Sequence, residues 1–134
     1  MEYIEPNFIE EWNEAKRYSC FKRMGMKKWV EYAKNNYEID HYKRIKNHLT
    51  NVDLDFESLE PEKKERFEKA FHEGKIELPM VIKFAHNDYE LMGGNTRTAG
   101  LVKHGINPKM WIINGDRDSE MSMKEDKDRK STRL

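Results

Sequence analysis

This chain of 134 residues has almost no thiol chemistry, because Cys20 is its one cysteine. A lone cysteine cannot close a disulfide within the chain, and without a second thiol there is neither a disulfide framework nor a zinc finger built on cysteine. A metal site built on histidine is not expected either, since the five histidines are scattered and no pair has a metal-ligand spacing shared with carboxylates. The disulfide-stapled and zinc-finger classes of protein are therefore excluded.

Long apolar runs are missing as well. The longest uninterrupted apolar runs are three or four residues long, such as residues 80–82 and 110–113. A membrane-spanning helix needs roughly 20 residues. The first six residues, Met-Glu-Tyr-Ile-Glu-Pro, contain no basic region followed by an apolar one, so no signal peptide is expected. We therefore expect a cytoplasmic protein with no membrane partner.

The chain is rich in charge instead. Charged and apolar residues each make up 37% of it, which predicts one polar-surfaced domain with a modest core. The 25 basic residues balance the 25 acidic ones, but the two kinds are separated along the chain. Residues 16–48 contain ten basic and three acidic side chains, residues 51–92 contain six and eleven, and residues 93–114 contain three and none. Both positive stretches suit an anionic partner.

Helical spacing of apolar residues dominates the first half of the chain. Asn7 is a good N-cap for a helix whose apolar face includes Phe8 and Trp12. Pro61 suits the first turn of a later helix, and Gly74 suits its left-handed end. The helices predicted in this way cover residues 7–20, 26–36, 38–48 and 61–73.

Strand-like segments are concentrated in the second half. Residues 79–84 and 89–92 are apolar runs on either side of a turn at residues 87–88, which predicts a hairpin. A short helix is expected over residues 98–104, and a last strand over residues 109–113.

The remaining segments complete the predicted organisation. Residues 52–56 alternate apolar and acidic side chains, as in a half-buried strand or an extended entry to the next helix. Residues 115–134 carry six acidic and six basic side chains and few large apolar ones, which predicts a flexible charged tail. The chain thus divides into a helical, basic and aromatic segment over residues 1–50, a core over residues 51–114, and the tail.

The most informative motif is the run Gly93-Gly94-Asn95-Thr96-Arg97 between a predicted strand and a predicted helix. Two glycines let the backbone turn sharply and approach a ligand, and the next helix presents free N–H groups and the positive end of its dipole. Asn95 and Thr96 add an amide and a hydroxyl, and Arg97 adds a planar fork of donors suited to two phosphate oxygens. The run therefore predicts a phosphate-binding site. The alternative is a tight turn with Thr96 as a helix cap and Arg97 in solvent.

The order of elements around this run resembles the ParB/sulfiredoxin superfamily, the fold of the ParB-like nuclease and ParB N-terminal domains. The resemblance extends from about residue 53 to residue 113, and includes the helix that ends at Gly74, the hairpin, the glycine-to-arginine box and the last strand. It implies an α+β fold with a small mixed β-sheet core. In that superfamily the box contacts the phosphates of a nucleotide or, in some members, of a nucleic acid, which implies a phosphate cradle over residues 93–97.

The box differs from that of familiar members of the superfamily. ParB proteins have a box that looks like Gly-Glu-Arg-Arg, where this chain has Asn95 and Thr96, so the CTP clamp of chromosome partitioning is not implied. Sulfiredoxins have a cysteine beside a histidine there, so reduction of sulfinic acids is not expected. A kinase-like member needs ATP, a divalent metal and a carboxylate base. The carboxylates available for such a role, each more often a solvated acid, are Asp53, Asp55, Glu57 and Glu77.

The basic stretch 16–48 interleaves cations with aromatic rings. Cations that neutralise phosphates, beside rings that stack on bases, suit single-stranded nucleic acid or a duplex backbone. The alternative is an amphipathic helical cap that packs Trp29, Val30 and Ala33 on the sheet while its lysines face water. The aromatic residues are Tyr18, Phe21, Trp29, Tyr32, Tyr37 and Tyr42, and the candidate nucleic-acid contacts are Lys22, Arg23, Lys27 and Lys28.

Two functions fit these observations. The first is a ParB-like protein that binds nucleotide or nucleic-acid phosphates and catalyses phosphoryl transfer, or hydrolysis of a phosphodiester or nucleotide, in DNA-related metabolism, with ATP or CTP and Mg²⁺ as its cofactors. The second is a non-catalytic accessory module, of a virus or mobile element, that keeps the fold and binds DNA or a protein. The sequence alone names no catalytic residue and no metal ligand.

Overall fold

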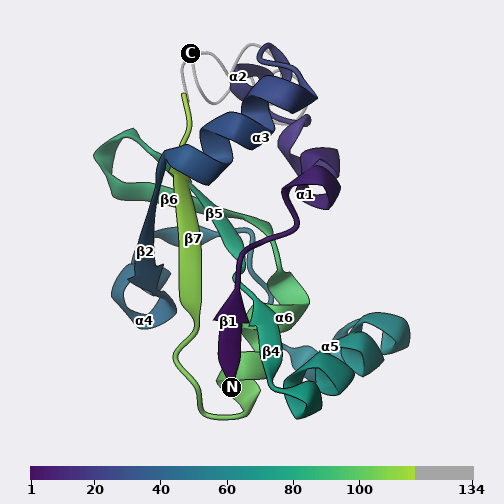
Figure 1. Cartoon of the computed structure of the whole chain (residues 1–134). Helices are drawn as coiled ribbons and strands as arrows, with labels where there is room; N and C mark the ends of the chain where they lie inside the picture. Colours follow the sequence, from purple (N-terminus) through teal and green to yellow (C-terminus); the bar gives the residue numbers. More distant parts are fainter. Residues whose placement is uncertain (117–134) are drawn as a thin grey trace.

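A computed structural model describes residues 1–116 of the chain, apart from the side chain of His86. Helices and strands are mixed along the chain, and the strands form one five-stranded mixed sheet and one two-stranded sheet (Figure 1). The predicted α+β class is therefore confirmed. The tail predicted over residues 115–134 lies outside the described residues from residue 117 onward.

The larger sheet is built around strands β5 and β7. β5 and β6 form the predicted antiparallel hairpin, and β5 pairs in parallel with β7 on its other side. β2 adds antiparallel to β7, and β3 adds parallel to β6. Continuous apolar runs in β5 and β7 fit strands that are covered on both faces. In spatial order the strands are β2 (Tyr37–His41), β7 (Lys109–Asn114), β5 (Met80–Phe84), β6 (Asp88–Gly93) and β3 (Leu49–Thr50).

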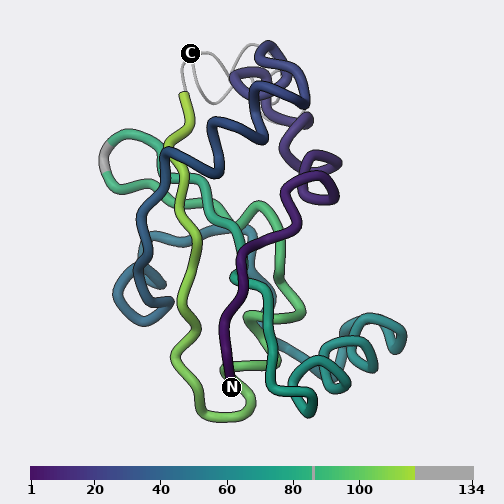
Figure 2. The backbone as a smooth tube through the Cα atoms, viewed as in Figure 1, coloured from purple at the N-terminus to yellow at the C-terminus, as the bar shows by residue number. Residues whose placement is uncertain are grey.

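A second sheet joins the start of the chain to its middle. β1 (Glu2–Ile4) pairs in parallel with β4 (Lys75–Glu77), and the Leu78 amide donates to the Ile4 carbonyl at 3.0 Å. Figure 2 shows the purple N-terminal segment running beside the teal segment that contains β4. Strands of three residues have too little periodicity to be predicted from sequence. Their pairing fixes the direction from which the first helix approaches the core.

Six α-helices and three 3₁₀ turns occur in the described residues, and none of these helices has the length and apolar character to cross a membrane. The helix predicted over residues 61–73 is confirmed, and Gly74 ends it in the left-handed region at φ +82°. The helix predicted over residues 26–36 is confirmed to within one residue. The α-helices are α1 (Phe8–Ala15), α2 (Ser19–Lys22), α3 (Met26–Asn35), α4 (Tyr42–Ile45), α5 (Pro61–Glu73) and α6 (Asn95–Lys103), and the 3₁₀ turns are η1 (Lys46–His48), η2 (Phe56–Ser58) and η3 (Ala85–Asn87).

The helix predicted over residues 7–20 is in fact divided in two. Its start is correct, because the Asn7 side chain accepts a hydrogen bond from the Glu10 amide. The chain then leaves the helical conformation at Tyr18, whose backbone is extended at φ −102° and ψ 125°. This break turns the Tyr18 ring inward against Phe21 and Phe84. The free energy gained by burying the Tyr18 ring thus outweighs the local preference for a continuous helix, which the apolar spacing of the sequence indicates.

The helix predicted over residues 38–48 is wrong. Residues 37–41 form strand β2, and only α4 and the η1 turn after it are helical. β2 has a continuous antiparallel register with β7, and the Tyr37 ring stacks on Trp111 with their centroids 3.7 Å apart. Pairing with a strand far along the chain outweighs the local apolar spacing.

Three apolar clusters make up the core. The largest packs α1, α2 and α3 on one face of the large sheet, with Trp29 completely buried. The second lies on the opposite face, where residues of α4 and β3 cover the sheet. The third joins α5 to α6, where Phe67 lies so close to Gly100 that a Cβ on this glycine would collide with the ring. Residues 1–50 therefore contribute both the helical cover of the sheet and two of its strands.

Candidate functional site

The glycine-to-arginine box forms the turn from strand β6 into helix α6. Gly94 has left-handed backbone angles, φ +95° and ψ 27°, and α6 begins at the next residue. The helix predicted over residues 98–104 therefore starts three residues too late. A Cβ on Gly94 would lie only 2.9 Å from both Pro79 Cα and Arg97 Nη2, so this position requires glycine for its conformation and for its contacts. Arg97 becomes the third residue of α6.

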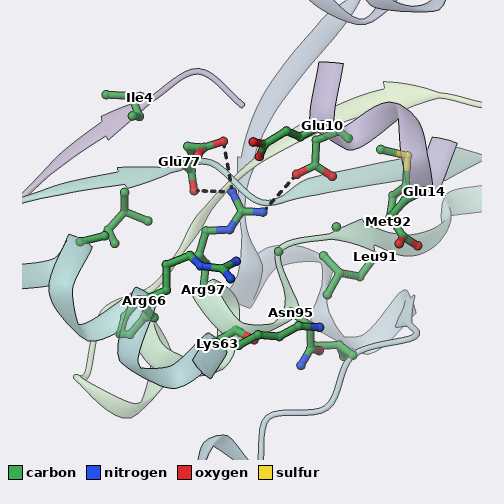
Figure 3. Close-up of a pocket in the computed structure, with 18 of the residues that line it drawn as sticks. Ile4, Glu10, Glu14, Lys63, Arg66, Glu77, Leu91, Met92, Asn95 and Arg97 are labelled. Carbon is green, nitrogen blue, oxygen red and sulfur yellow. Dashed lines mark hydrogen bonds and ion pairs between the residues drawn. The ribbon is translucent and has the colours of Figure 1, made fainter. Parts of the chain in front are cut away.

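Arg97 is held between two carboxylates. Its Nη2 donates to Glu11 Oε2 at 3.2 Å, and its Nη1 donates to the Glu77 carbonyl at 3.3 Å and lies 3.8 Å from Glu77 Oε1. Figure 3 shows the Arg97 guanidinium at the centre of these contacts, with Glu77 on one side. Only 21% of the Arg97 side chain is exposed. The alternative in which Arg97 is simply solvated is therefore wrong.

Glu11 on α1 is the partner that the sequence does not predict. Its side chain is only 11% exposed, and a Cβ on Gly93 would collide with its Oε1. Gly93 thus leaves room for a carboxylate of the same chain. Acidic residues are ordinary in the first turn of a helix, so no local signal distinguishes Glu11 from Glu10 beside it.

Burial raises the pKa of the Glu11 carboxyl above its ordinary value of 4.5. The Arg97 guanidinium opposes this change, while the charges of Glu77 and Glu14 add to it. The net direction is upward because the ion pair does not fully offset the loss of hydration. The ionised form of Glu11 is therefore poorly stabilised where it lies.

This shift predicts a pH dependence of stability. The folded chain keeps the Glu11 proton to a higher pH than the unfolded chain, so the contribution of Glu11 to the free energy of unfolding falls as pH rises from 4.5 through its raised pKa. Glu11→Gln removes this contribution. We expect the difference in unfolding free energy, wild type minus variant, to decline across that interval in urea titrations at successive pH values. A difference that rises with pH would show that the ion pair outweighs burial.

Asn95 ties a loop to the start of α6. Its Oδ1 accepts from the Asp53 amide at 2.7 Å, and its Nδ2 donates to the Asp53 carbonyl at 2.9 Å. The side chain of Asn95 thus pairs with backbone, as a strand neighbour would. No strand forms over residues 52–56, because residues 52–55 are an extended entry to the next helical turn, η2, which begins at Phe56.

All five residues of the predicted box line one cleft of about 1050 Å³. Its walls come from α1, α5, the loop at residues 51–53, and the turn into α6. Six acidic and four basic side chains line it, so it is not a uniformly positive pocket. The acidic side chains are Glu10, Glu11, Glu14, Asp53, Glu73 and Glu77, and the basic ones are Lys63, Arg66, Lys75 and Arg97.

The four candidate carboxylates separate into two groups. Glu77 and Asp53 line the cleft, whereas Asp55 and Glu57 do not. Glu57 is instead paired with Lys103 at 2.8 Å, and this hydrogen bond lowers the pKa of its carboxyl. In the described part of the chain, no three histidine, cysteine, aspartate or glutamate side chains are arranged so that they alone could hold a metal ion.

The candidate nucleic-acid contacts lie on α2, on α3 and between them. Lys22, Arg23, Lys27 and Lys28 are all exposed, and among residues 1–116 none of them has an ion-pair partner. We call these four side chains the basic face. In Figure 1, α2 and α3 lie at one end of the molecule and α5 at the other, so the basic face is separate from the cleft walls formed by α5.

The aromatic residues of this stretch are mostly committed to the core. Tyr18, Phe21 and Trp29 are buried, so their rings cannot stack on bases. Tyr37 is about half exposed, but it already stacks on Trp111. The predicted packing of Trp29, Val30 and Ala33 on the sheet is confirmed, with Trp29 and Ala33 buried and Val30 partly buried.

Comparisons with protein-family models, with curated proteins and with solved structures find no match to this chain. A function for this chain is therefore proposed from the geometry of the site.

Proposed function

We propose that the cleft binds a phosphate-bearing ligand at the turn from β6 into α6. The observation that carries this proposal is the position of Arg97, whose guanidinium faces the cleft from the first turn of α6. The first N–H groups of a helix have no carbonyl partner within the helix, and the dipole favours an anion there. A guanidinium beside those groups adds two parallel donors for phosphate oxygens.

A nucleotide is the ligand class that the cleft suits best. A volume of about 1050 Å³ exceeds what a single phosphate group needs. The two candidate carboxylates of the cleft, Asp53 and Glu77, fit a Mg²⁺ ion that arrives with ATP or CTP, because Mg²⁺ prefers oxygen ligands and is usually held by one or two carboxylates and the phosphates. Phosphoryl transfer or nucleotide hydrolysis, in a protein similar to the ParB/sulfiredoxin superfamily, is the reaction that we propose.

The test is a titration of the full chain with ATP, CTP and short DNAs, with and without Mg²⁺, followed by analysis of the products. Binding of a nucleotide with turnover supports the enzyme. Binding without turnover supports a non-catalytic module with the same site. If no nucleotide binds under any of these conditions, either to this chain or to a variant in which the charge of Glu11 is removed, the proposal is wrong.

A second function is supported by the basic face alone. Four exposed cations without ion-pair partners in the described residues suit the backbone of a nucleic acid. In this case the protein is a DNA-binding accessory module and the cleft plays no part in DNA binding.

This second function predicts a strong salt dependence. Replacing the basic face by glutamine (Lys22, Arg23, Lys27 and Lys28) should lower the affinity for duplex DNA and reduce the slope of log K against log salt by about 0.9 for each phosphate that the protein no longer neutralises. The matched control neutralises four exposed lysines elsewhere, Lys43, Lys46, Lys69 and Lys109. Equal losses of affinity in the two variants would show that only net charge matters. Fluorescence anisotropy at several salt concentrations measures both quantities.

A further inference from the structure

The anion that Arg97 binds in this structure belongs to the protein itself. Glu11 reaches from α1 to Arg97 and fills the space above Gly93 that a side chain at this position would occupy. A carboxylate therefore lies against a glycine of the turn and against the guanidinium of a residue in the first turn of a helix, where a phosphate group would be expected.

Glu11 is not needed to neutralise Arg97. The Glu77 carbonyl accepts a hydrogen bond from Arg97 Nη1, and Glu77 Oε1 lies 3.8 Å from the same nitrogen. Two carboxylates thus share one cation, and burial makes the ionised form of Glu11 costly there. A phosphate group has more charge and more acceptor oxygens than a carboxylate, so it can compete for the same donors.

We propose that Glu11 is a built-in competitor of the ligand, and that a phosphate-bearing ligand enters the cleft by taking Arg97 from the Glu11 carboxylate. This inference rests on the proposed function of the cleft. It adds that competition from Glu11 limits the affinity of the cleft for a phosphate-bearing ligand. Glu77 stays in place, because its carboxylate accepts a hydrogen bond from the Asn7 amide at 2.8 Å and its backbone pairs with β1.

The side chain of Glu11 moves, and helix α1 does not. Phe8 and Ala15, near the two ends of α1, are buried in the largest apolar cluster, and the Phe8 ring packs on Trp111. Moving the helix would expose both residues, whereas turning one glutamate side chain into the open cleft exposes only a carboxylate that water solvates well.

The experiment compares two neighbouring glutamates of α1. Glu11→Gln keeps the size of the side chain and removes its charge. Glu10→Gln is the matched control, because Glu10 lines the same cleft on the same helix and, in the described residues, makes neither a hydrogen bond nor an ion pair with Arg97. Glu11→Ala is a second variant, which removes the competing group altogether. Calorimetric titration of each full-length variant with ATP, CTP and inorganic pyrophosphate provides the dissociation constants.

We expect Glu11→Gln and Glu11→Ala to bind the probes about three- to tenfold more tightly than wild type, and Glu10→Gln to differ from wild type by less than about twofold. Binding by the Glu11 variants alone would also support the inference. If wild type binds a probe and the Glu11 variants bind it no more tightly than Glu10→Gln does, the competitor role is wrong while the proposed function stands. If none of the chains binds any probe, both are wrong.

Discussion

Arg97→Ala is expected to weaken the binding of ATP or CTP by about ten- to a hundredfold. Charge-assisted hydrogen bonds contribute about 1.5–3 kcal/mol each, and 1.4 kcal/mol corresponds to a factor of ten in the dissociation constant. Arg97→Lys should recover only part of the loss, because an ammonium group keeps the charge and lacks the planar pair of donors. Calorimetric titration of the folded variants measures the effect.

The Arg97 variant also needs a control for folding, because it leaves Glu11 buried without its cation. The double variant Glu11→Gln, Arg97→Ala removes both charges of the pair and keeps the turn intact. We expect it to be more stable than Arg97→Ala and still to bind nucleotide weakly. Unchanged nucleotide binding in this double variant would contradict the phosphate site, and with it the main reason to regard the protein as an enzyme.

The parts of the fold that the sequence predicts are those with local signals. Pro61 and Gly74 mark the two ends of α5, and both act through their own backbone preferences. The hairpin of β5 and β6 is predicted equally well, because two apolar runs stand on either side of a short turn. Strand β2 is mistaken for a helix because its register depends on β7, which lies far along the chain. Short strands such as β1 leave no periodicity to read.

The same distinction applies to the site. The turn at Gly94 and the position of Arg97 at the start of a helix follow from residues that are neighbours in sequence. Glu11 is 86 residues away from Arg97, so only the folded chain brings the two together. The contact with Glu11 also changes the interpretation of Gly93. The sequence predicts that this glycine leaves space for a ligand, and the structure shows a carboxylate of the same chain in that space. A glycine-rich turn indicates that some group lies close to the backbone. It does not indicate whether that group belongs to a ligand or to the chain itself.

Gly94→Val should destabilise the folded chain by about 2–5 kcal/mol. A left-handed backbone costs a residue with a Cβ about 1–2 kcal/mol, and crowding of a packed site adds about 1–3 kcal/mol. Both costs apply, because Gly94 has φ +95° and its Cβ would lie 2.9 Å from the Pro79 backbone and from Arg97 Nη2. We expect the melting temperature to fall by more than about 8 °C.

Gly74→Val is the matched control that separates these two costs. Gly74 also has a left-handed backbone, at φ +82°, but its Cβ would have nothing within 4 Å. Its variant should therefore lose only the conformational part, about 1–2 kcal/mol. The additional loss in Gly94→Val measures how tightly Pro79 and Arg97 close around the turn. If both variants lose the same free energy in urea titrations, the turn has room for a side chain, and Arg97 is not held by it in the position that the phosphate site requires.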